Sequence, residues 1–330
     1  MIISRTPFRI SFLGGGTDLP DFYQEEEGAV LSTTIDKYIY ITVNDRFDDT
    51  YRLSYSKTEI CKTVEEIEHK IFRCVLEKYG AEAREKNGGR GLELLSMADI
   101  PSGTGLGSSS SFTVALLHAM SAHNGQFRSA EDLAAEACRI EIEDLREPIG
   151  KQDQYAAAVG GLQYIRFLPS GEVSCEPVIC SRQTKSALQS SMMLFYTGMT
   201  RSASGVLSEQ KSNTAGKRET LRAMRDLALR LKKILENGED ISRVGELLHE
   251  GWMLKKTLAS GISASQIDQW YERARSAGAR GGKILGAGGG GFLMVTCDPE
   301  KQSRVRQELS ELRQVPVELE AFGSRILFVG

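Results

Sequence analysis

The sequence lacks the features that mark disulfide-rich, zinc-binding, membrane-spanning and nucleic-acid-binding proteins. Its six cysteines form no Cys-x-x-Cys pair and only four histidines are present, so neither a disulfide framework nor a zinc site is expected. No apolar run approaches the roughly 20 residues that cross a bilayer, and the N-terminus lacks the pattern of a signal peptide. The net charge of −3 gives no basic excess for nucleic acid. We therefore expect a cytoplasmic protein with reduced thiols that partners neither nucleic acid nor membrane.

What is present suits a chain of two domains, since 330 residues with 41% hydrophobic side chains can bury a sizeable core. Strands and helices are expected to mix without regular βαβ alternation, which favours an α+β fold. Apolar periodicity predicts strands near 1–13, 28–46, 92–97, 192–197, 292–296, 315–320 and 324–329, and helices near 64–79, 109–123, 129–145, 203–236, 242–259, 264–277 and 299–312.

The segment Pro101-Ser-Gly-Thr-Gly-Leu-Gly-Ser-Ser-Ser-Ser111 leads directly into an apolar helical run. A glycine-rich turn lets backbone N–H groups converge, and the helix that follows adds its positive dipole end. This combination predicts a site for the phosphates of a nucleotide, with serine hydroxyls available to a phosphate-bound Mg²⁺. It is not a Walker A loop, because no lysine follows the last glycine, and its glycine spacing differs from the dinucleotide fingerprint. The alternative is a loop that only caps a helix.

Two further glycine clusters flank this segment in the sequence. One runs from Gly281 to Phe292 and contains seven glycines, a composition that suggests close backbone approach, or else a mobile hairpin. The other is Gly14-Gly-Gly-Thr-Asp18, directly after the first predicted strand. It could present Asp18 to a hydroxylated ligand, or form a tight turn that Asp18 caps.

In this order the three clusters resemble the GHMP kinase superfamily, which includes galactokinase, homoserine kinase, mevalonate kinase and phosphomevalonate kinase. The first motif corresponds to Thr6-Pro7-Phe8-Arg9, the second to Pro101–Ser109 and the third to Gly286–Gly291. The resemblance implies a two-domain fold and the use of ATP and Mg²⁺. Residues 1–187 would form an ATP-binding domain like ribosomal protein S5 domain 2, and residues 188–330 a ferredoxin-like domain.

The resemblance also implies roles for individual residues. Ser109 and Glu141 would bind Mg²⁺, with Glu143 or Asp144 as alternatives to Glu141. Asp153 would be the catalytic carboxylate, either as a base or as a group that orients the acceptor hydroxyl, and Arg9 would accompany it. The residues that would bind the ATP phosphates are Pro101, Gly103, Gly105, Leu106, Gly107, Ser108, Ser109 and Ser110.

Within the superfamily, residues 5–20, 148–154 and 196–204 resemble the D-glycero-D-manno-heptose 7-phosphate kinases. These enzymes phosphorylate the anomeric hydroxyl and give the 1,7-bisphosphate used for nucleotide-activated heptose and surface glycans. The implied partners are a small sugar phosphate and ATP. The same signature occurs in fucokinase-like enzymes, which leaves a sugar 1-kinase acting on a free sugar as an alternative. Retention of the catalytic and metal residues speaks against the third alternative, a catalytically silent sugar sensor.

The acceptor residues are expected in three places. Thr17, Asp18 and Asp36 are candidate ligands of sugar hydroxyls, and the glycine cluster adds Gly288 and Gly289. Arg201 is the candidate for a distal phosphate, since arginine suits bidentate phosphate binding, and Lys211 and Lys283 are weaker candidates. The other basic residues between 201 and 233 are expected to form a solvated helix face. A homodimer is compatible with the sequence, which contains no motif that requires one.

Overall fold

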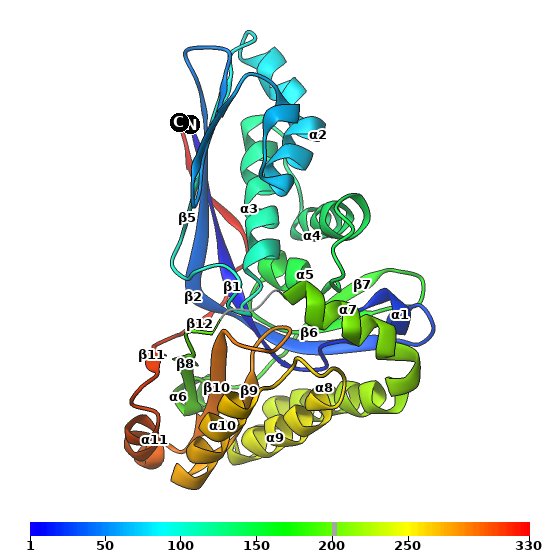
Figure 1. The fold of residues 1–330 in the computed structure, drawn as a ribbon, viewed down its shortest axis with the longest axis vertical. Helices are drawn as coiled ribbons and strands as arrows, with labels where there is room; N and C mark the ends of the chain where they lie inside the picture. The colour runs from blue at the N-terminus through cyan, green and yellow to red at the C-terminus, as the bar shows by residue number, and fades with distance from the viewer. Residues whose placement is uncertain (200–202) are drawn as a thin grey trace.

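The computed structural model describes residues 1–199 and 203–330 and contains two β-sheets with helices packed against them (Figure 1). The larger sheet has the main order β13-β1-β2-β5-β3-β4, with β12 and β6 also paired to β2, and β7 paired to β6. The smaller sheet has the order β11-β8-β10-β9. The α+β class is confirmed.

The strands of the larger sheet are β1 (Ile2–Leu13), β2 (Gly28–Asp45), β3 (Tyr51–Ser54), β4 (Thr58–Cys61), β5 (Leu92–Ala98), β6 (Leu162–Phe167), β7 (Val173–Pro177), β12 (Leu319–Glu320) and β13 (Arg325–Val329). Those of the smaller sheet are β8 (Met192–Tyr196), β9 (Ala279–Ile284), β10 (Phe292–Cys297) and β11 (Arg313–Val315).

The helices that surround these sheets are α1 (Pro20–Tyr23), α2 (Lys70–Lys86), α3 (Ser108–His123), α4 (Ala130–Cys138), α5 (Gln152–Val159), α6 (Arg182–Ser191), α7 (Ala203–Asn213), α8 (Arg218–Asn237), α9 (Ser242–Lys256), α10 (Ser265–Ala277) and α11 (Gln302–Glu308). Short 3₁₀ segments cover Val64–Glu66, Thr214–Lys217 and Pro299–Lys301, and a π-helical turn covers Arg139–Asp144.

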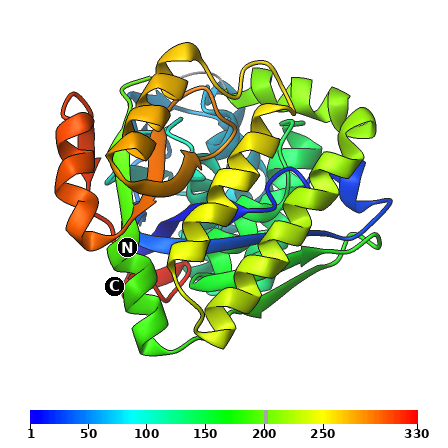
Figure 2. The same cartoon turned by 90° about the horizontal axis from the view of Figure 1, so that it is seen from below.

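The long strand β1 pairs with β2 along nearly its whole length and carries Arg9, one of the predicted site residues. Near its start β1 alternates between buried and half-buried residues, but from Thr6 onward all its residues are buried. Burial is continuous there because helices contact β1 from two sides, α3 and α5 along its upper part and α8 and α9 below (Figures 1 and 2). The C-terminal strand β13 returns to pair with β1.

Helix α3 begins where the glycine-rich loop predicted it would. Gly107 is its N-cap residue and has φ +75°, a left-handed conformation that glycine adopts without strain. Most of the helix is buried, including Val114, Leu116 and Leu117, because it fills the space between β1, β2 and helices α2, α4 and α5. Its N-terminal end therefore has a fixed position and direction.

Several elements differ from the prediction. The strand expected over 315–320 is two strands, β11 and β12, which belong to different sheets. The helix expected from residue 64 begins at Lys70, because Thr63 and Glu66 form a capping box around a 3₁₀ turn and His69 caps α2 by accepting a hydrogen bond from the N–H of Phe72. The helix expected over 203–236 is interrupted by the 3₁₀ segment before α8. Strand β9 was not predicted, since the three glycines around it hid its pattern. The division of the chain at residue 187 stays a prediction.

Candidate active site

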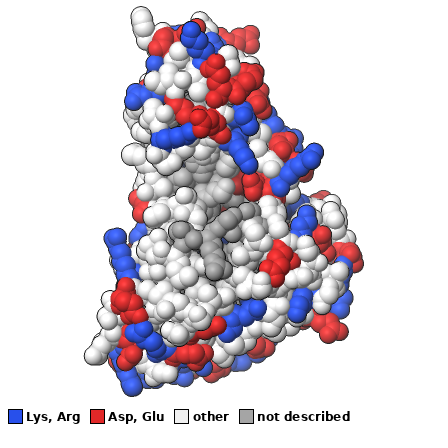
Figure 3. Space-filling model, in the orientation of Figure 1, with Lys and Arg blue, Asp and Glu red and all other residues white. Residues whose placement is uncertain are grey.

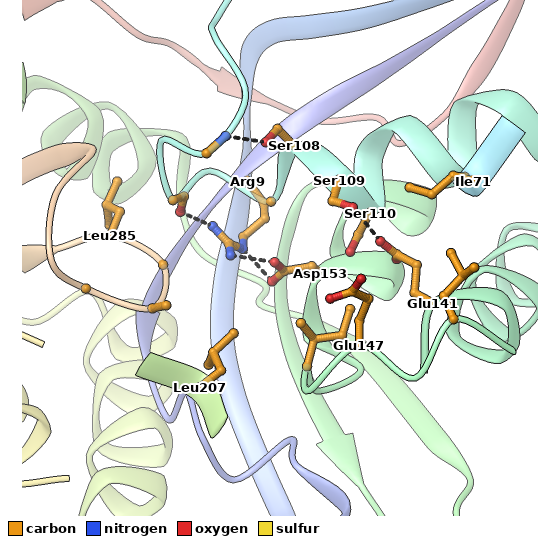
Figure 4. Close-up of a pocket in the computed structure, with 18 of the residues that line it drawn as sticks. Arg9, Ile71, Ser108, Ser109, Ser110, Glu141, Glu147, Asp153, Leu207 and Leu285 are labelled. Atoms are coloured by element: carbon orange, nitrogen blue, oxygen red, sulfur yellow. Dashed lines mark hydrogen bonds and ion pairs between the residues drawn. The ribbon is translucent and has the colours of Figure 1, made fainter. Parts of the chain in front are cut away.

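A cavity of about 440 Å³ lies between the glycine- and serine-rich loop, the π-helical turn and the loop after β9. Six of the residues predicted to bind ATP line it: Gly103, Gly105, Gly107, Ser108, Ser109 and Ser110. Figure 4 shows Ser109 beside Glu141, and Asp153 beside Arg9 next to the same loop. The opposite wall contains Leu285, Gly286 and Gly288.

The backbone of this loop is shaped to bind an anion. Gly103, Gly105 and Gly107 all have positive φ, a left-handed backbone conformation that residues with a side chain rarely adopt. The Oγ atom of Ser108 accepts a hydrogen bond from the N–H of Gly103 at 3.3 Å and closes the loop. The N-terminal end of α3, with its unpaired N–H groups and positive dipole, then faces the cavity. The geometry suits the phosphates of a nucleotide.

The two glycine-rich loops touch each other, backbone against backbone. A Cβ atom on Gly105 would lie 2.3 Å from the carbonyl oxygen of Leu285, and one on Gly286 would lie 2.4 Å from the Cα atom of Gly105. Similarly, a Cβ atom on Gly291 would lie 2.2 Å from the carbonyl oxygen of Thr104. These glycines are needed for contact between loops that are about 180 residues apart in the sequence.

Arg9 on β1 holds the carboxylate of Asp153, in the first turn of α5, through two hydrogen bonds. Nε donates to Oδ1 at 2.8 Å and Nη2 donates to Oδ2 at 2.7 Å. The remaining Nη1 donates to the carbonyl oxygen of Gly105 at 2.6 Å. Arg9 is almost fully buried, whereas the side chain of Asp153 keeps 23% exposure and faces the cavity. Paired in this way, Asp153 can accept a hydrogen bond from a ligand.

Glu141 lies in the π-helical turn, a distortion that often occurs at functional sites, and its residue is only 1% exposed. Its Oε1 atom accepts from the Ser109 hydroxyl at 2.8 Å, and its Oε2 atom accepts from Nε2 of Gln154 at 2.8 Å. Burial raises the pKa of Glu141 to about 7, although hydrogen bonds from Ser109, Ser110 and Gln154 oppose the shift. A buried carboxylate without a cationic partner beside a serine hydroxyl suits a divalent cation.

A second, smaller cavity of about 80 Å³ adjoins the first and shares Arg9 and Asp153 with it. Asp18 lies in its wall, where it accepts hydrogen bonds from the N–H of Gly16 at 2.8 Å and of Gln152 at 3.3 Å. Burial is the main reason that the pKa of Asp18 is raised. Two buried lysines, Lys255 and Lys283, also line this cavity. It therefore offers both signs of charge to a polar molecule beside Asp153.

Comparison with known proteins decides the family. The family model of the GHMP kinases N terminal domain matches residues 69–161, and that of the GHMP kinases C terminal matches residues 224–313. The chain is also 30% identical over 311 residues to D-glycero-alpha-D-manno-heptose 7-phosphate kinase of Campylobacter jejuni, covering 91% of each sequence. The chain belongs to the GHMP kinases. The expected family is thus confirmed, and with it an ATP-dependent sugar kinase.

Two further proteins are similar to this GHMP kinase, one in its fold and the other in its sequence. A D-glycero-D-manno-heptose 1-phosphate kinase from Bacteroides thetaiotaomicron has the same fold, with a TM-score of 0.81 over 100% of both chains at 24% identity. The L-fucokinase/L-fucose-1-P guanylyltransferase of Bacteroides fragilis is 27% identical over 94% of this chain, which corresponds to 36% of that longer protein.

Among the described residues, no helix is both long and apolar enough to cross a membrane.

The structure places two of the predicted acceptor residues of the GHMP kinase away from both cavities. The hydroxyl of Thr17 is buried and donates to the carbonyl oxygens of Gly14 and Ala29, so it holds a turn. Asp36 pairs with Lys37 and accepts from the backbone N–H of Glu318 at 2.8 Å. Both side chains are occupied in structural contacts, whereas Asp18 faces the smaller cavity.

Other predicted residues lie around the site rather than in its walls. Leu106 is buried, and its carbonyl oxygen accepts from the N–H of Arg9 at 3.1 Å, so it anchors the loop to β1. Pro101 is exposed at the start of the loop. The N–H of Gly289 donates to the carbonyl oxygen of Ile262, while its neighbour Gly288 lines the larger cavity. Arg201 lies outside the described residues.

The basic residues between 201 and 233 join α7 and α8 to the turn after β1. Lys211 lies 3.8 Å from Asp21, and Arg222 and Arg225 both contact Glu26. Arg218 pairs with Glu25. On the face drawn in Figure 3, basic and acidic side chains are interspersed. The expectation of a solvated helix face therefore holds for these residues, with the addition that they pair with acids from a distant segment.

Sequence reasoning missed several residues that the fold brings to the site. Lys255 lies in the last turn of α9, next to Lys256, and nothing in the sequence pattern of this helix indicates that Lys255 reaches the site. Glu147 lines the larger cavity and follows Arg146, the only described residue other than glycine with a positive φ, of 55°. Of the three acids considered for the metal, Glu141 lines that cavity, while Glu143 and Asp144 are exposed and Asp144 pairs with Lys78.

Proposed function

We propose that this kinase transfers the γ-phosphoryl group of ATP to the anomeric hydroxyl of D-glycero-D-manno-heptose 7-phosphate and so makes the 1,7-bisphosphate, for nucleotide-activated heptose and surface glycan synthesis. One observation carries the reaction: the larger and the smaller cavity share Arg9 and Asp153. A nucleotide in the first and a sugar in the second would meet at this carboxylate. The choice of heptose is supported by the relative in Campylobacter jejuni.

In this proposal Asp153 acts on the hydroxyl of the sugar. The hydroxyl oxygen forms a bond to the γ-phosphorus, the bond from that phosphorus to the β,γ-bridging oxygen breaks, and ADP leaves. The hydroxyl proton passes to Asp153 or is only oriented by it, and both descriptions need the carboxylate to be ionised and fixed. Arg9 supports both, since its two hydrogen bonds fix the carboxylate.

The donor set fits the Mg²⁺ that this family implies. Ser109 and Glu141 would hold the ion, because their oxygen atoms lie 2.8 Å apart beside the phosphate loop and oxygen ligands are those that Mg²⁺ prefers. When bound, the ion would neutralise charge on the phosphate oxygens of ATP.

The charges around the smaller cavity suit an anionic, hydroxylated acceptor. Three basic side chains, Lys255, Lys283 and Arg9, and two acidic ones, Asp18 and Asp153, line this cavity. Asp18 can accept hydrogen bonds from sugar hydroxyls, and the lysines can donate to sugar or phosphate oxygens. Arg201 and Gly288 remain candidates for further contacts with the acceptor.

The second candidate is a sugar 1-kinase that acts on an unphosphorylated sugar such as fucose. It is favoured by the similarity of nearly the whole chain to 36% of the length of L-fucokinase/L-fucose-1-P guanylyltransferase. The two candidates differ in whether the acceptor already carries a phosphate.

A panel of acceptors separates them. ATP consumption is measured with heptose 7-phosphate, free heptose, fucose, galactose and mannose, each at equal concentration. The proposal predicts that kcat/KM for heptose 7-phosphate exceeds that for free heptose by at least about tenfold, since hydrogen bonds to charged groups contribute roughly 1.5–3 kcal/mol. Faster turnover of fucose or of free heptose would contradict it and favour the second candidate.

A further inference from the structure

We infer that Lys255 is an acceptor-binding residue of this kinase, whose ammonium group holds an oxygen atom of the sugar next to the hydroxyl that attacks ATP. The inference deepens the proposed function and depends on it for the position of the acceptor. Helix α9 would then take a direct part in substrate binding, although it contains none of the three glycine motifs.

The position of Lys255 is the first support. Its residue is 7% exposed and lies at the C-terminal end of α9, in the wall of the smaller cavity. Its Nζ atom donates a hydrogen bond to the carbonyl oxygen of Gly286, the glycine that touches the phosphate loop at Gly105. The ammonium group is therefore fixed beside the point where the two glycine-rich loops meet.

The hydrogen-bond capacity of the cavity is the second support. An ammonium has three N–H donors. Among the described residues Lys255 uses one of them, and Lys283 uses two, on the carbonyl oxygens of Ser11 at 2.8 Å and Phe12 at 2.9 Å. Two side-chain atoms of the same cavity, Oγ of Ser11 and Oε1 of Gln152, have no hydrogen-bond partner in the described structure. A polyhydroxylated molecule can satisfy all of these groups together.

The lack of a direct ion pair is the third support. No carboxylate of the described residues lies within 4.0 Å of the Lys255 ammonium, whereas its neighbour Lys256 contacts Asp268 at 3.2 Å and lies over the ring of Trp252. A buried ammonium without a paired carboxylate is unfavourable in the empty site. An acceptor oxygen that accepts a hydrogen bond from this ammonium would offset part of the penalty.

The groups that face Lys255 define its titration. Arg9 from β1 disfavours its charge, while Asp18 from the turn after β1 and Asp153 from α5 favour it. Lys283 from β9 also faces it, and burial together with the charges of Lys255 and Arg9 lowers the pKa of Lys283 well below its usual range. Burial is the largest effect, and the pKa of Lys255 is lowered to about 8. The ammonium form is therefore lost at mildly alkaline pH, within the range where the kinase can be assayed.

The test compares Lys255→Met and Lys255→Arg with Lys256→Met, a matched control on the same helix. The acceptor is whichever sugar of the panel the wild type phosphorylates best, so failure of heptose 7-phosphate as substrate would not stop the test. We expect Lys255→Met to lower kcat/KM for the acceptor by about 10- to 100-fold, the range for a hydrogen bond to a charged group. Affinity for ADP, measured by titration calorimetry, should change less than about threefold. Lys256→Met should match the wild type in both measurements.

The pH profile gives a second readout that does not need Lys255→Met to fold. In the wild type, kcat/KM for the acceptor should fall above about pH 8 as the ammonium loses its proton, and in Lys255→Arg this alkaline limb should be absent because a guanidinium stays charged. Equal losses of ADP affinity and acceptor kcat/KM in Lys255→Met would show that the residue only supports the Gly286 loop. That result, or an alkaline limb unchanged in Lys255→Arg, would overturn the inference.

Discussion

Arg9 and Asp153 are joined by two parallel hydrogen bonds of 2.8 and 2.7 Å, although 144 residues separate them in the sequence. A third hydrogen bond from Arg9 reaches the carbonyl oxygen of Gly105 in the phosphate loop. One guanidinium thus fixes the proposed catalytic carboxylate relative to the site proposed for the ATP phosphates. The pair stands at the boundary of both cavities, where the transfer would take place.

Replacing Asp153 tests this arrangement. Asp153→Asn keeps the size of the side chain but removes its charge and its ability to accept a proton. We expect kcat to fall by about 10²- to 10⁴-fold, the range attributed to general acid–base catalysis, while ADP affinity stays close to that of the wild type. Steady-state kinetics and calorimetry measure the two quantities. A variant with full turnover would show that Asp153 is not the catalytic carboxylate.

The proposed metal site predicts a selective loss of cation binding. Glu141→Gln and Ser109→Ala should each weaken binding of Mn²⁺, used as a spectroscopic substitute for Mg²⁺, in the ADP complex by about tenfold or more. Glu143→Gln serves as the control, because Glu143 is an exposed acid two residues away in the same π-helical turn. Electron paramagnetic resonance of free Mn²⁺ gives the affinities. Equal behaviour of Glu141→Gln and Glu143→Gln would contradict the assignment.

The contact between the glycine-rich loops can be tested with two alanine variants that introduce a similar backbone strain. Gly103 and Gly105 have φ values of +74° and +83°. Because this left-handed backbone conformation is unfavourable for alanine, the substitution should destabilise the fold by about 1–2 kcal/mol at either position. Only at Gly105 does the new Cβ atom meet another loop, 2.3 Å from the Leu285 carbonyl oxygen, whereas the space at Gly103 is open. We expect Gly105→Ala to be destabilised by about 1–3 kcal/mol more than Gly103→Ala in urea unfolding. Equal destabilisation would mean that the loops separate freely.

Because the carboxyl group of Asp18 is buried, we expect its removal to stabilise the protein by an amount that depends on pH. Its pKa is higher in the folded chain than in the unfolded one, so folding takes up protons and stability falls as pH rises through that interval. Asp18→Asn abolishes this loss, and its Oδ1 atom can still accept from the N–H of Gly16. We expect the variant to be more stable than the wild type near pH 8 and to lose this advantage toward pH 4.

Urea unfolding at several pH values measures the difference for Asp18→Asn. The exposed Asp21, three residues later, provides the control variant Asp21→Asn. A stability difference for Asp18→Asn that does not depend on pH would refute the argument from burial.

Local sequence patterns predicted the parts of the site that depend on local structure. The spacing of Gly103, Gly105 and Gly107 before an apolar run was enough to predict both the phosphate loop and the start of α3, because a glycine turn and a helix dipole act over a few residues. The resemblance to a family then led to Arg9 and Asp153, which the fold brings into contact. Asp36 was expected near the acceptor, but the fold turns it toward Glu318, a residue of the far end of the chain.

What local patterns could not show depends on tertiary contacts. Lys255 and Lys256 look equivalent in the sequence, yet Lys255 is buried in the wall of the smaller cavity and Lys256 pairs with Asp268. The near contact of Gly105 with Leu285 likewise arises only when two distant loops pack together. Which face of α9 turns inward is decided by its packing against β9 and α8, and no spacing within the helix identifies the one lysine that reaches the site.

The position of the transferred phosphate tests the central claim most directly. The kinase is incubated with ATP, Mg²⁺ and D-glycero-D-manno-heptose 7-phosphate, and the product is analysed by two-dimensional ¹H–³¹P NMR. The account predicts a new phosphate coupled to the anomeric proton, besides the original phosphate at carbon 7, and far less of this product with Asp153→Asn over the same time. A new phosphate coupled to any other sugar proton, or no product with the wild type, would contradict it.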